Sequence, residues 1–363
     1  MDPKMYRQLM LQCSRFLSGR HPQTWLPKDI LSGLAEMVQV DTSPDIYGTG
    51  EYINGFEEEI ANILGKEAAV FMPSGTMAQQ IALRIWTDRK GIKNVAFHPS
   101  CHLERHELKA YQVLHGLHGI LIGSMDHLIT LGDLKRVSEP LGALLLELPQ
   151  REIGGQLPVW EELLAIIEWA GEQNIPLHMD GARLWECKPF YQKEYSEIAR
   201  LFDSVYVSLY KGLGAVSGAV LAGPADFIAE SRIWLRRHGG NLKSMYPFVL
   251  SAKSGLDHYL GKMDLYHQKA VEVSRILSSF TEINVLPDPP HTNMMHMYIQ
   301  ADYESLEKAN IEVAQEKGIL LLGRLVRSSL PGFQKCEVTI QDAALELSAE
   351  EIRNAFEELF EKI

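Results

Sequence analysis

The sequence predicts an α/β protein in which a mostly parallel β-sheet is covered by helices and followed by a smaller α+β domain. Short apolar runs alternate with helical patterns over the first two thirds of the chain, as buried parallel strands do. The 363 residues suffice for one large core and a smaller lobe. We expect an N-terminal helical segment at 1–44, a large domain at 45–246 and a small C-terminal domain at 247–363.

The first half of the chain supplies most of the alternation. Helical spacing over residues 1–40 gives way to a turn-rich segment and then to a helix that ends near Gly65. AAVFM has the character of a strand, PSGT that of a turn, and MAQQIALRIW resumes the helical period. Further strands are expected at NVAF (94–97), GILIG (119–123), ALLLEL (143–148), PLHMD (176–180), SVYVSL (204–209) and SGAVLAG (217–223).

The pattern changes near Met245, after which helical spacing extends over 248–280. A Pro-rich turn, a strand MMHMYIQ, a helix around SLEKANIEVAQEKG and short strands at GILLLG and CEVTI are expected to follow. The final helix begins at Ser348, with Glu351 three residues later, which is the pattern of a capping box.

The composition is that of a globular protein. With 46% apolar residues and a formal net charge of −12, we expect no general nucleic-acid or anionic-membrane binding. No apolar run approaches the length of a membrane span, and the first twenty or so residues lack the apolar core of a signal peptide. The 4 cysteines are scattered without a C-x-x-C pair, so we expect a cytoplasmic protein without disulfides.

Two of the predicted strands end on charged residues that chemistry can use. PLHMD ends on Asp180, and SVYVSL leads into Lys211 among glycines. A buried carboxylate requires a cation or hydrogen-bond donors, and a protonated pyridine nitrogen is such a cation. The lysine amine can form a Schiff base with a cofactor carbonyl. The alternatives are that Asp180 pairs with Arg183 and that Lys211 is solvated.

Ser74, Gly75 and Thr76 lie where a strand turns into a helix. Backbone N–H groups and the helix dipole favour an anion there, and small residues let a phosphate approach closely. An ordinary helix cap is the alternative interpretation. A single cofactor accounts for this turn together with Asp180 and Lys211: pyridoxal 5′-phosphate, with its phosphate at the turn, its ring nitrogen at the acid and its aldehyde on the lysine.

The segment HPSCHLERHE allows three interpretations of His102. A metal site would use His102 and His106, with His98 and Cys101 nearby. The spacing departs from H-E-x-x-H, because Glu104 occupies the middle position, and we predict no metal. The ring could instead lie flat against a planar cofactor, or the residue could be a surface histidine at a helix start.

The segments YGTGEYINGFEEEIANILGKEAAVFMPSGTMAQQIAL, HMDGARLWE and SLYKGLGAVSGAVLAG resemble the threonine aldolase branch of the β-eliminating lyase family. These are fold-type I pyridoxal-phosphate enzymes, and the resemblance covers roughly residues 45–300. It implies a Schiff base on Lys211, a pyridine partner in Asp180, a ring contact from His102, and phosphate contacts from Gly75 and Thr76 beside Ser74.

The resemblance also implies contacts with the substrate and a second phosphate contact. Arg183 corresponds to the family arginine that approaches the cofactor or the substrate carboxylate, and Tyr47 belongs to a matching YG pair. Lys243 stands in the turn HGGNLKS where an arginine is usual, so its phosphate contact would be a point charge. The proton acceptor is left open between His102, a bound water and another histidine such as His106.

The C-terminal domain departs from the family pattern. Its R-x-V-T-H motif appears here as CEVTI, with Cys336 in place of the arginine and Ile340 in place of the histidine. That arginine would hold an amino acid carboxylate with two hydrogen bonds. Arg324 and Arg327 are the candidates to replace it.

We therefore predict a pyridoxal-phosphate lyase that cleaves the Cα–Cβ bond of a threonine-like β-hydroxy-α-amino acid to glycine and an aldehyde. The first alternative is β-elimination, deamination or transamination of another amino compound, and a remote one is a non-catalytic homologue that binds the cofactor. A nicotinamide dehydrogenase is disfavoured, because no G-x-G-x-x-G opens a helix after a strand. The resemblance also implies a homodimer or homotetramer acting on a small amino acid.

Overall fold

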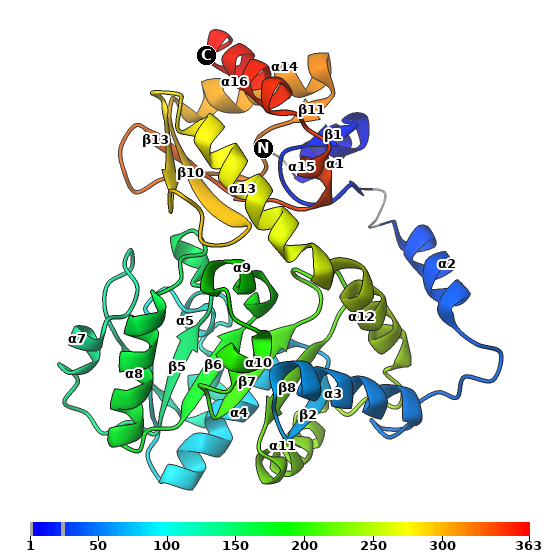
Figure 1. Ribbon diagram of the computed structural model, residues 1–363, viewed down its shortest axis with the longest axis vertical. Coiled ribbons are helices and arrows are strands. Elements are labelled where there is room, and N and C mark those ends of the chain that lie inside the picture. The colour runs from blue at the N-terminus through cyan, green and yellow to red at the C-terminus, as the bar shows by residue number, and fades with distance from the viewer. Residues whose placement is uncertain (1–2, 23–25) are drawn as a thin grey trace. The chain divides into compact units, whose positions relative to one another are not determined.

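The computed structural model describes residues 3–22 and 26–363, and the chain divides into two compact units (Figure 1). The large unit consists of Glu36–Glu152 and Leu157–Gly261. The small unit consists of Met1–Ala35, Ile153–Gln156 and Lys262–Ile363. Helix α2 (Pro27–Met37) and the 3₁₀ turn η2 (Arg151–Ile153) cross the limits between the two units.

A 7-stranded sheet forms the centre of the large unit, in the order β2-β8-β7-β6-β5-β3-β4. β8 is antiparallel to both of its neighbours, and every other pair is parallel, which confirms the mostly parallel sheet. The strands are β2 (Ala68–Met72), β3 (Asn94–Phe97), β4 (His118–Leu121), β5 (Ala143–Glu147), β6 (Leu177–Gly181), β7 (Ser204–Ser208) and β8 (Ala219–Gly223).

Helices cover both faces of this sheet. Apolar side chains of α4 and α11 pack with alternate strand residues into one core. Phe71, on the opposite face of β2, meets Phe56 of α3 edge to face, with ring centroids 6.4 Å apart. The helices are α3 (Glu51–Leu64), α4 (Gly75–Lys90), α5 (His102–Arg105), α6 (Ala110–His115), α7 (Leu131–Leu134), α8 (Trp160–Glu172), α9 (Lys188–Tyr191), α10 (Tyr195–Ala199), α11 (Ala225–Arg237) and α12 (Tyr246–Tyr259), with the 3₁₀ turn η3 (Leu184–Glu186).

The small unit is built on a 4-stranded antiparallel sheet in the order β12-β13-β10-β9, and on a parallel pair of β1 with β11. The capping box predicted at Ser348 and Glu351 is present. Its elements are α1 (Pro3–Gln12), β1 (Arg15–Phe16), α13 (Met263–Leu277), β9 (Ile283–Leu286), β10 (Met294–Gln300), α14 (Tyr303–Lys317), β11 (Ile319–Leu320), β12 (Leu325–Arg327), β13 (Phe333–Thr339), α15 (Asp342–Leu345) and α16 (Ala349–Glu361).

The helical stretch expected over 248–280 is interrupted. α12 ends at Tyr259, a 3₁₀ turn η4 (Leu260–Lys262) follows, and α13 begins at Met263. Gly261 lies in this turn, and glycine has low helix propensity because its backbone loses the most entropy on ordering.

Three general findings concern the described residues, 3–22 and 26–363. None of their helices is both long and apolar enough to cross a membrane. They contain no group of three or more His, Cys, Asp or Glu side chains that could hold a metal ion. The four cysteines are buried and free.

Candidate active site

Polar residues gather at one edge of the large sheet. β2, β7, β6, β5 and β3 run in the same direction, so their carboxyl ends share this edge. In open α/β sheets, ligands bind outside the carboxyl ends of the strands. Close to these ends the chain carries Ser74, Lys211, Asp180, Glu147 and His98. The structure thus brings three residues predicted from the sequence, Ser74, Asp180 and Lys211, to the same edge.

Asp180 is a buried carboxylate held by neutral donors. Its side chain is 1% exposed. Gln79 Nε2 donates to Oδ2 at 2.5 Å, and the backbone N–H of Ala182 donates to Oδ1 at 3.0 Å. Across residues 3–22 and 26–363, no ion pair joins Asp180 to a cation. Arg183 approaches Glu186 instead, with 3.9 Å between Nε and Oε2, so the pairing of Asp180 with Arg183 is not seen.

A second carboxyl, which the sequence analysis did not single out, lies beside Asp180. Glu147 ends β5 and is paired in register with Asp180 on β6. Burial and the Asp180 charge raise the pKa of Glu147 to about 7, although Lys211 and His102 act in the opposite direction. The sequence contained a signal for Glu147 as a site residue, because the strand ALLLE ends on an acid as PLHMD does.

Lys211 follows β7 by three residues and is partly buried. Burial and the nearby Arg183 charge lower the pKa of Lys211, and they outweigh the opposite effects of Asp180 and Glu147. A lysine in such surroundings carries more neutral amine near pH 7 than a solvated one, and the neutral amine is the nucleophile.

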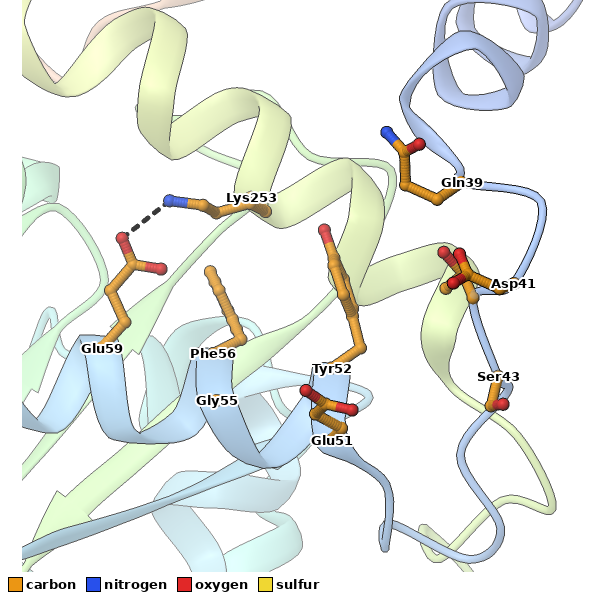
Figure 2. Close-up of a pocket in the computed structure, with 10 residues that line it drawn as sticks. Gln39, Asp41, Ser43, Glu51, Tyr52, Gly55, Phe56, Glu59 and Lys253 are labelled. Atoms are coloured by element: carbon orange, nitrogen blue, oxygen red, sulfur yellow. Dashed lines mark hydrogen bonds and ion pairs between the residues drawn. The ribbon is translucent and has the colours of Figure 1, made fainter.

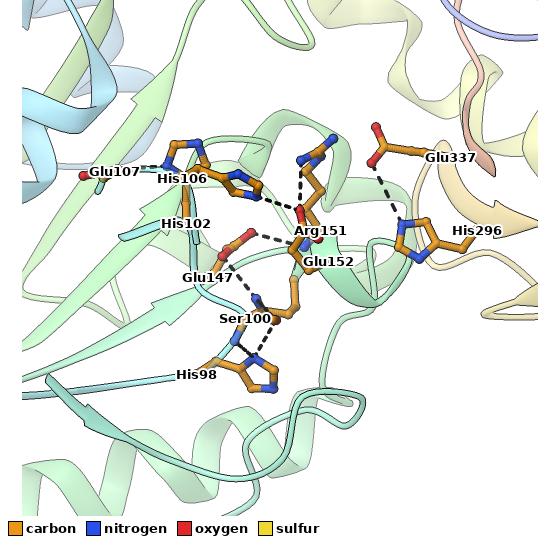
Figure 3. Close-up of polar contacts among 11 residues, drawn as sticks. His98, Ser100, His102, His106, Glu107, Glu147, Arg151, Glu152, His296 and Glu337 are labelled. Atoms are coloured by element: carbon orange, nitrogen blue, oxygen red, sulfur yellow. Dashed lines mark hydrogen bonds and ion pairs between the residues drawn. The ribbon is translucent and has the colours of Figure 1, made fainter. Parts of the chain in front are cut away.

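His102 begins α5 and is oriented by a buried acid (Figure 3). Its Nδ1 lies 2.9 Å from Glu107 Oε1, and Gln80 Nε2 donates to Glu107 Oε2 at 3.3 Å. Such a contact fixes the ring and leaves its other nitrogen available. The segment HPSCHLERHE ends on this glutamate, but only the fold shows that Glu107 holds the imidazole.

His106 lies next to His102, with ring centroids 5.0 Å apart. Its Nε2 is 3.0 Å from Glu152 Oε1, to which Arg151 also donates at 3.0 Å (Figure 3). Both histidines considered as proton acceptors are therefore held by carboxylates, and they neighbour each other.

The turn from β2 into α4 has the geometry expected of an anion site. Ser74 is the N-cap and accepts from the backbone N–H of Met77 at 3.3 Å. Gly75 and Thr76 occupy the first helical positions, whose N–H groups have no intrahelical acceptor. Gly75 is packed against Tyr206 of β7, since a Cβ there would lie 1.9 Å from the tyrosine hydroxyl oxygen.

Gly75→Ala is expected to lower the free energy of unfolding of the cofactor-free protein by about 1–3 kcal/mol, because the new methyl group would overlap the buried Tyr206 ring. Urea unfolding followed by circular dichroism measures the loss. Gly171→Ala in α8 is the matched control, since nothing lies within 4 Å of its Cβ position. Equal stabilities of the two variants would contradict the prediction.

Two predicted site residues lie in a separate cluster. The backbone N–H of Tyr47 donates to the carbonyl of Lys243 at 2.9 Å, and Tyr47 is 58% exposed. Buried Asp45 fixes the turn by accepting from the N–H groups of Met245 and Tyr246. Among the contacts of residues 3–22 and 26–363, none joins Tyr47 or Lys243 to Asp180, Lys211 or His102.

The C-terminal motif that departs from the family pattern belongs to the core of the small unit. The burial of β13 alternates, so Cys336 and Val338 face that core, and Ile340 joins the same cluster. Burial raises the pKa of the Cys336 thiol to about 12. Of the two candidate replacements, Arg324 is exposed and Arg327 pairs with Glu304 at 2.5 Å.

A surface cavity of about 570 Å³ lies elsewhere in the large unit, between α3, α12 and the segment before α3 (Figure 2). Lys253 enters it, held by Glu59 at 2.7 Å, and the Tyr52 ring forms part of its wall. None of the residues predicted for the site lines this cavity.

This chain is similar to known proteins in sequence and in structure. The family model for beta-eliminating lyases matches residues 32–302. A "putative L-allo-threonine aldolase" from Listeria monocytogenes EGD-E has 42% identity and a TM-score of 0.94, covering 99% of this chain and 100% of that one. A "putative aromatic amino acid beta-eliminating lyase/threonine aldolase" from Exiguobacterium sp. 255-15 has 39% identity and a TM-score of 0.93, covering 99% of each chain.

A curated protein is also similar in sequence. Low-specificity L-threonine aldolase 1 of Arabidopsis thaliana is 27% identical over 296 residues, which are 79% of this chain and 82% of that protein.

Proposed function

Because this chain belongs to the β-eliminating lyase family, we propose that it is a pyridoxal-phosphate-dependent aldolase of amino acid metabolism that cleaves threonine-like β-hydroxy-α-amino acids to glycine and an aldehyde. The fold is that of the fold-type I pyridoxal-phosphate enzymes. The observation that carries the proposal is the meeting of Asp180, Lys211 and the start of α4 at one sheet edge.

The residues present fit pyridoxal phosphate. Glu147 and Asp180 are neighbouring carboxyl groups, and no cation in the described chain forms an ion pair with either. A protonated pyridine nitrogen would supply one. The start of α4 would take the phosphate through the N–H groups of Gly75 and Thr76 and the Ser74 hydroxyl. Lys211 provides an amine that burial makes less basic.

Each residue then has a task in the reaction. When bound, pyridoxal phosphate supplies an electron sink for the charge that develops at the substrate Cα. Asp180 would pair with the protonated ring nitrogen, and the Lys211 amine would hold the cofactor covalently. His102, fixed by Glu107, would provide the contact with the cofactor ring that the family resemblance implies.

Arg183 is the cation proposed to orient the substrate carboxylate. Its side chain is 14% exposed, and its Nε lies 3.9 Å from Glu186 Oε2. A guanidinium held in this way presents its remaining N–H groups as a fork for a carboxylate. The proton of the β-hydroxyl passes to His102, to His106 or to a bound water.

Incubation of the cofactor-loaded protein with threonine is expected to yield equal amounts of glycine and acetaldehyde. Acetaldehyde is measured by a coupled alcohol dehydrogenase assay, and glycine by chromatography. The control is the same protein with alanine, which has no β-hydroxyl group, in place of threonine. Loss of threonine with formation of ammonia and a keto acid would favour β-elimination over aldol cleavage.

Further expectations belong to the same proposal. The enzyme acts in the cytoplasm on a small amino acid, and it assembles as a homodimer or homotetramer. Tyr47 lies near the substrate and Lys243 contacts a phosphate, both as inferred from the family resemblance. The division of the chain at 44/45 and 246/247 also remains a proposal.

A further inference from the structure

Glu147 is a shielded carboxyl at the candidate site to which the mechanism above gives no task. It ends β5 directly opposite Asp180 at the end of β6. Side chains of registered residues on parallel strands point to the same face, and the strands lie about 4.8 Å apart. The two carboxyl groups therefore stand side by side at the sheet edge.

The surroundings of Glu147 offer it neutral hydrogen bonds. Gln150 Nε2 donates to Oε2 at 3.1 Å, and the backbone N–H of Arg151 donates to Oε1 at 3.2 Å (Figure 3). Gln150 also donates to Ser100 Oγ at 3.1 Å, which holds the amide in place.

Charged and titratable groups face Glu147 from every neighbouring element. They are Asp180 on β6, Lys211 after β7, His102 on α5, the Cys101 thiol before α5 and Arg151 on η2. Of these, the Asp180 carboxylate has the largest electrostatic effect on Glu147. Two adjacent shielded carboxylates repel each other, so one of such a pair holds a proton until a cation arrives.

Hydrogen-bond geometry distinguishes the two carboxyl groups. Both oxygens of each group accept N–H donors, but the bonds to Asp180 (2.5 and 3.0 Å) are shorter than those to Glu147 (3.1 and 3.2 Å), so the negative charge is better stabilised on Asp180. The proton therefore belongs to Glu147. A cation bound at Asp180 neutralises the charge that keeps Glu147 protonated.

We propose that Glu147 is a positioning residue of the cofactor pocket, which carries a proton in the free protein and releases it to solvent when a protonated pyridine nitrogen binds at Asp180. The O–H bond of Glu147 breaks, water takes the proton, and no electrons change hands. The inference rests on the proposed cofactor site. Its consequence is that cofactor binding is coupled to pH through a group that does not touch the reacting bond.

The sign of the coupling follows from the release of a proton, because a binding step that releases protons becomes more favourable as pH rises. With a pKa of about 7, Glu147 is about half protonated at pH 7 and nearly fully protonated at pH 6. The contribution of Glu147 should make pyridoxal phosphate bind about tenfold more tightly near pH 8 than near pH 6.

Isothermal titration of the cofactor-free full-length protein with pyridoxal phosphate tests this inference. Runs in buffers of low and high ionisation enthalpy, near pH 6, 7 and 8, give the number of protons released. Wild type should release about one proton per site more than Glu147→Gln near pH 6 and about half a proton more near pH 7. The difference should nearly vanish near pH 8. Equal proton counts in the two proteins would overturn the proposal.

Glu57→Gln is the matched control. Glu57 is a buried carboxylate (4% exposed), but Arg232 neutralises it, with 2.6 Å between Nη2 and Oε2. Its proton count should equal that of wild type, whereas a loss like that of Glu147→Gln would show that any buried carboxylate has the same effect.

An infrared measurement on wild type alone covers the case in which Glu147→Gln fails to fold. The difference spectrum on cofactor binding near pH 6 should lose the C=O band of a protonated carboxyl group. A spectrum without that loss also overturns the proposal. If wild type binds no pyridoxal phosphate, the cofactor site itself fails, whereas binding with unchanged proton counts refutes only the inference on Glu147.

Discussion

Lys211→Ala is expected to remove the absorbance band of the lysine-bound cofactor and to lower threonine cleavage by roughly a thousandfold or more. Among the described residues, Lys211 is the lysine that directly follows β7, at the sheet edge where Asp180 lies. Without Nζ the aldehyde has no covalent partner, so a band due to a lysine-bound cofactor cannot form. Absorbance spectroscopy of the purified protein with added pyridoxal phosphate measures this directly.

Lys66→Ala is the matched control for this loss. Lys66 also has a lowered pKa, about 8, chiefly because of burial, and its Nζ donates to the carbonyl of Phe202. A lowered pKa alone would therefore also point to Lys66 as the reactive lysine. Lys66 does not follow β7 as Lys211 does, so its position excludes this role. The band should persist in Lys66→Ala. A band that survives in Lys211→Ala and disappears in Lys66→Ala would reverse the assignment.

Asp180→Asn is expected to reduce threonine cleavage by about a hundredfold, because it removes the carboxylate that is proposed to pair with the ring nitrogen and that two N–H donors hold in place. The Asp180→Asn variant should still fold. Asn Oδ1 can still accept from Ala182 N–H, and Gln79 can turn its amide so that Oε1, which has no partner in the described structure, accepts from Asn Nδ2. Steady-state kinetics with thermal unfolding as a check on folding measure the effect.

Asp203→Asn separates this charge effect from general damage to β6. Asp203 accepts from the backbone N–H of Leu177 at 2.7 Å, at the opposite end of the same strand. Its substitution should lower stability without a comparable loss of turnover. If Asp180→Asn retained full activity, the proposed contact with the ring nitrogen would be wrong.

The order of elements was predictable because each segment shows its own periodicity. AAVFM, ALLLE, PLHMD and SVYVS are all buried strands of one sheet, and the helix after PSGT begins at Gly75. Local pattern also placed Asp180 and Lys211 at strand ends. It could not show that β8 runs antiparallel, since a strand's direction in a sheet depends on its neighbours.

The partners of the site residues were not predictable, because each comes from a distant part of the chain. Gln79 and Asp180 are 101 residues apart in sequence but share a hydrogen bond. The sequence suggests that Gly75 serves the flexibility of a turn. In the structure glycine is required there because Tyr206 fills the space that a side chain would occupy.

The family resemblance predicts an arginine where this chain has Cys336, but the sequence could not show the structural setting of this residue. β13 presents Cys336 to the apolar core of the small unit, where a thiol is well accommodated. The sequence therefore predicted a departure from the family pattern. The alternating burial of β13 explains why the weakly polar Cys336 side chain is stable at this position.

For this protein, the sequence by itself determined the fold class, the family resemblance and the strand ends that carry Asp180 and Lys211. These properties are encoded in short segments, whose periodicity and turn residues act locally. Only the tertiary structure decided that Glu147 stands beside Asp180, that Gln79 holds it and that Glu107 fixes His102. Those facts depend on which strands pair and in which register, and this pairing is set by the packing of the whole sheet.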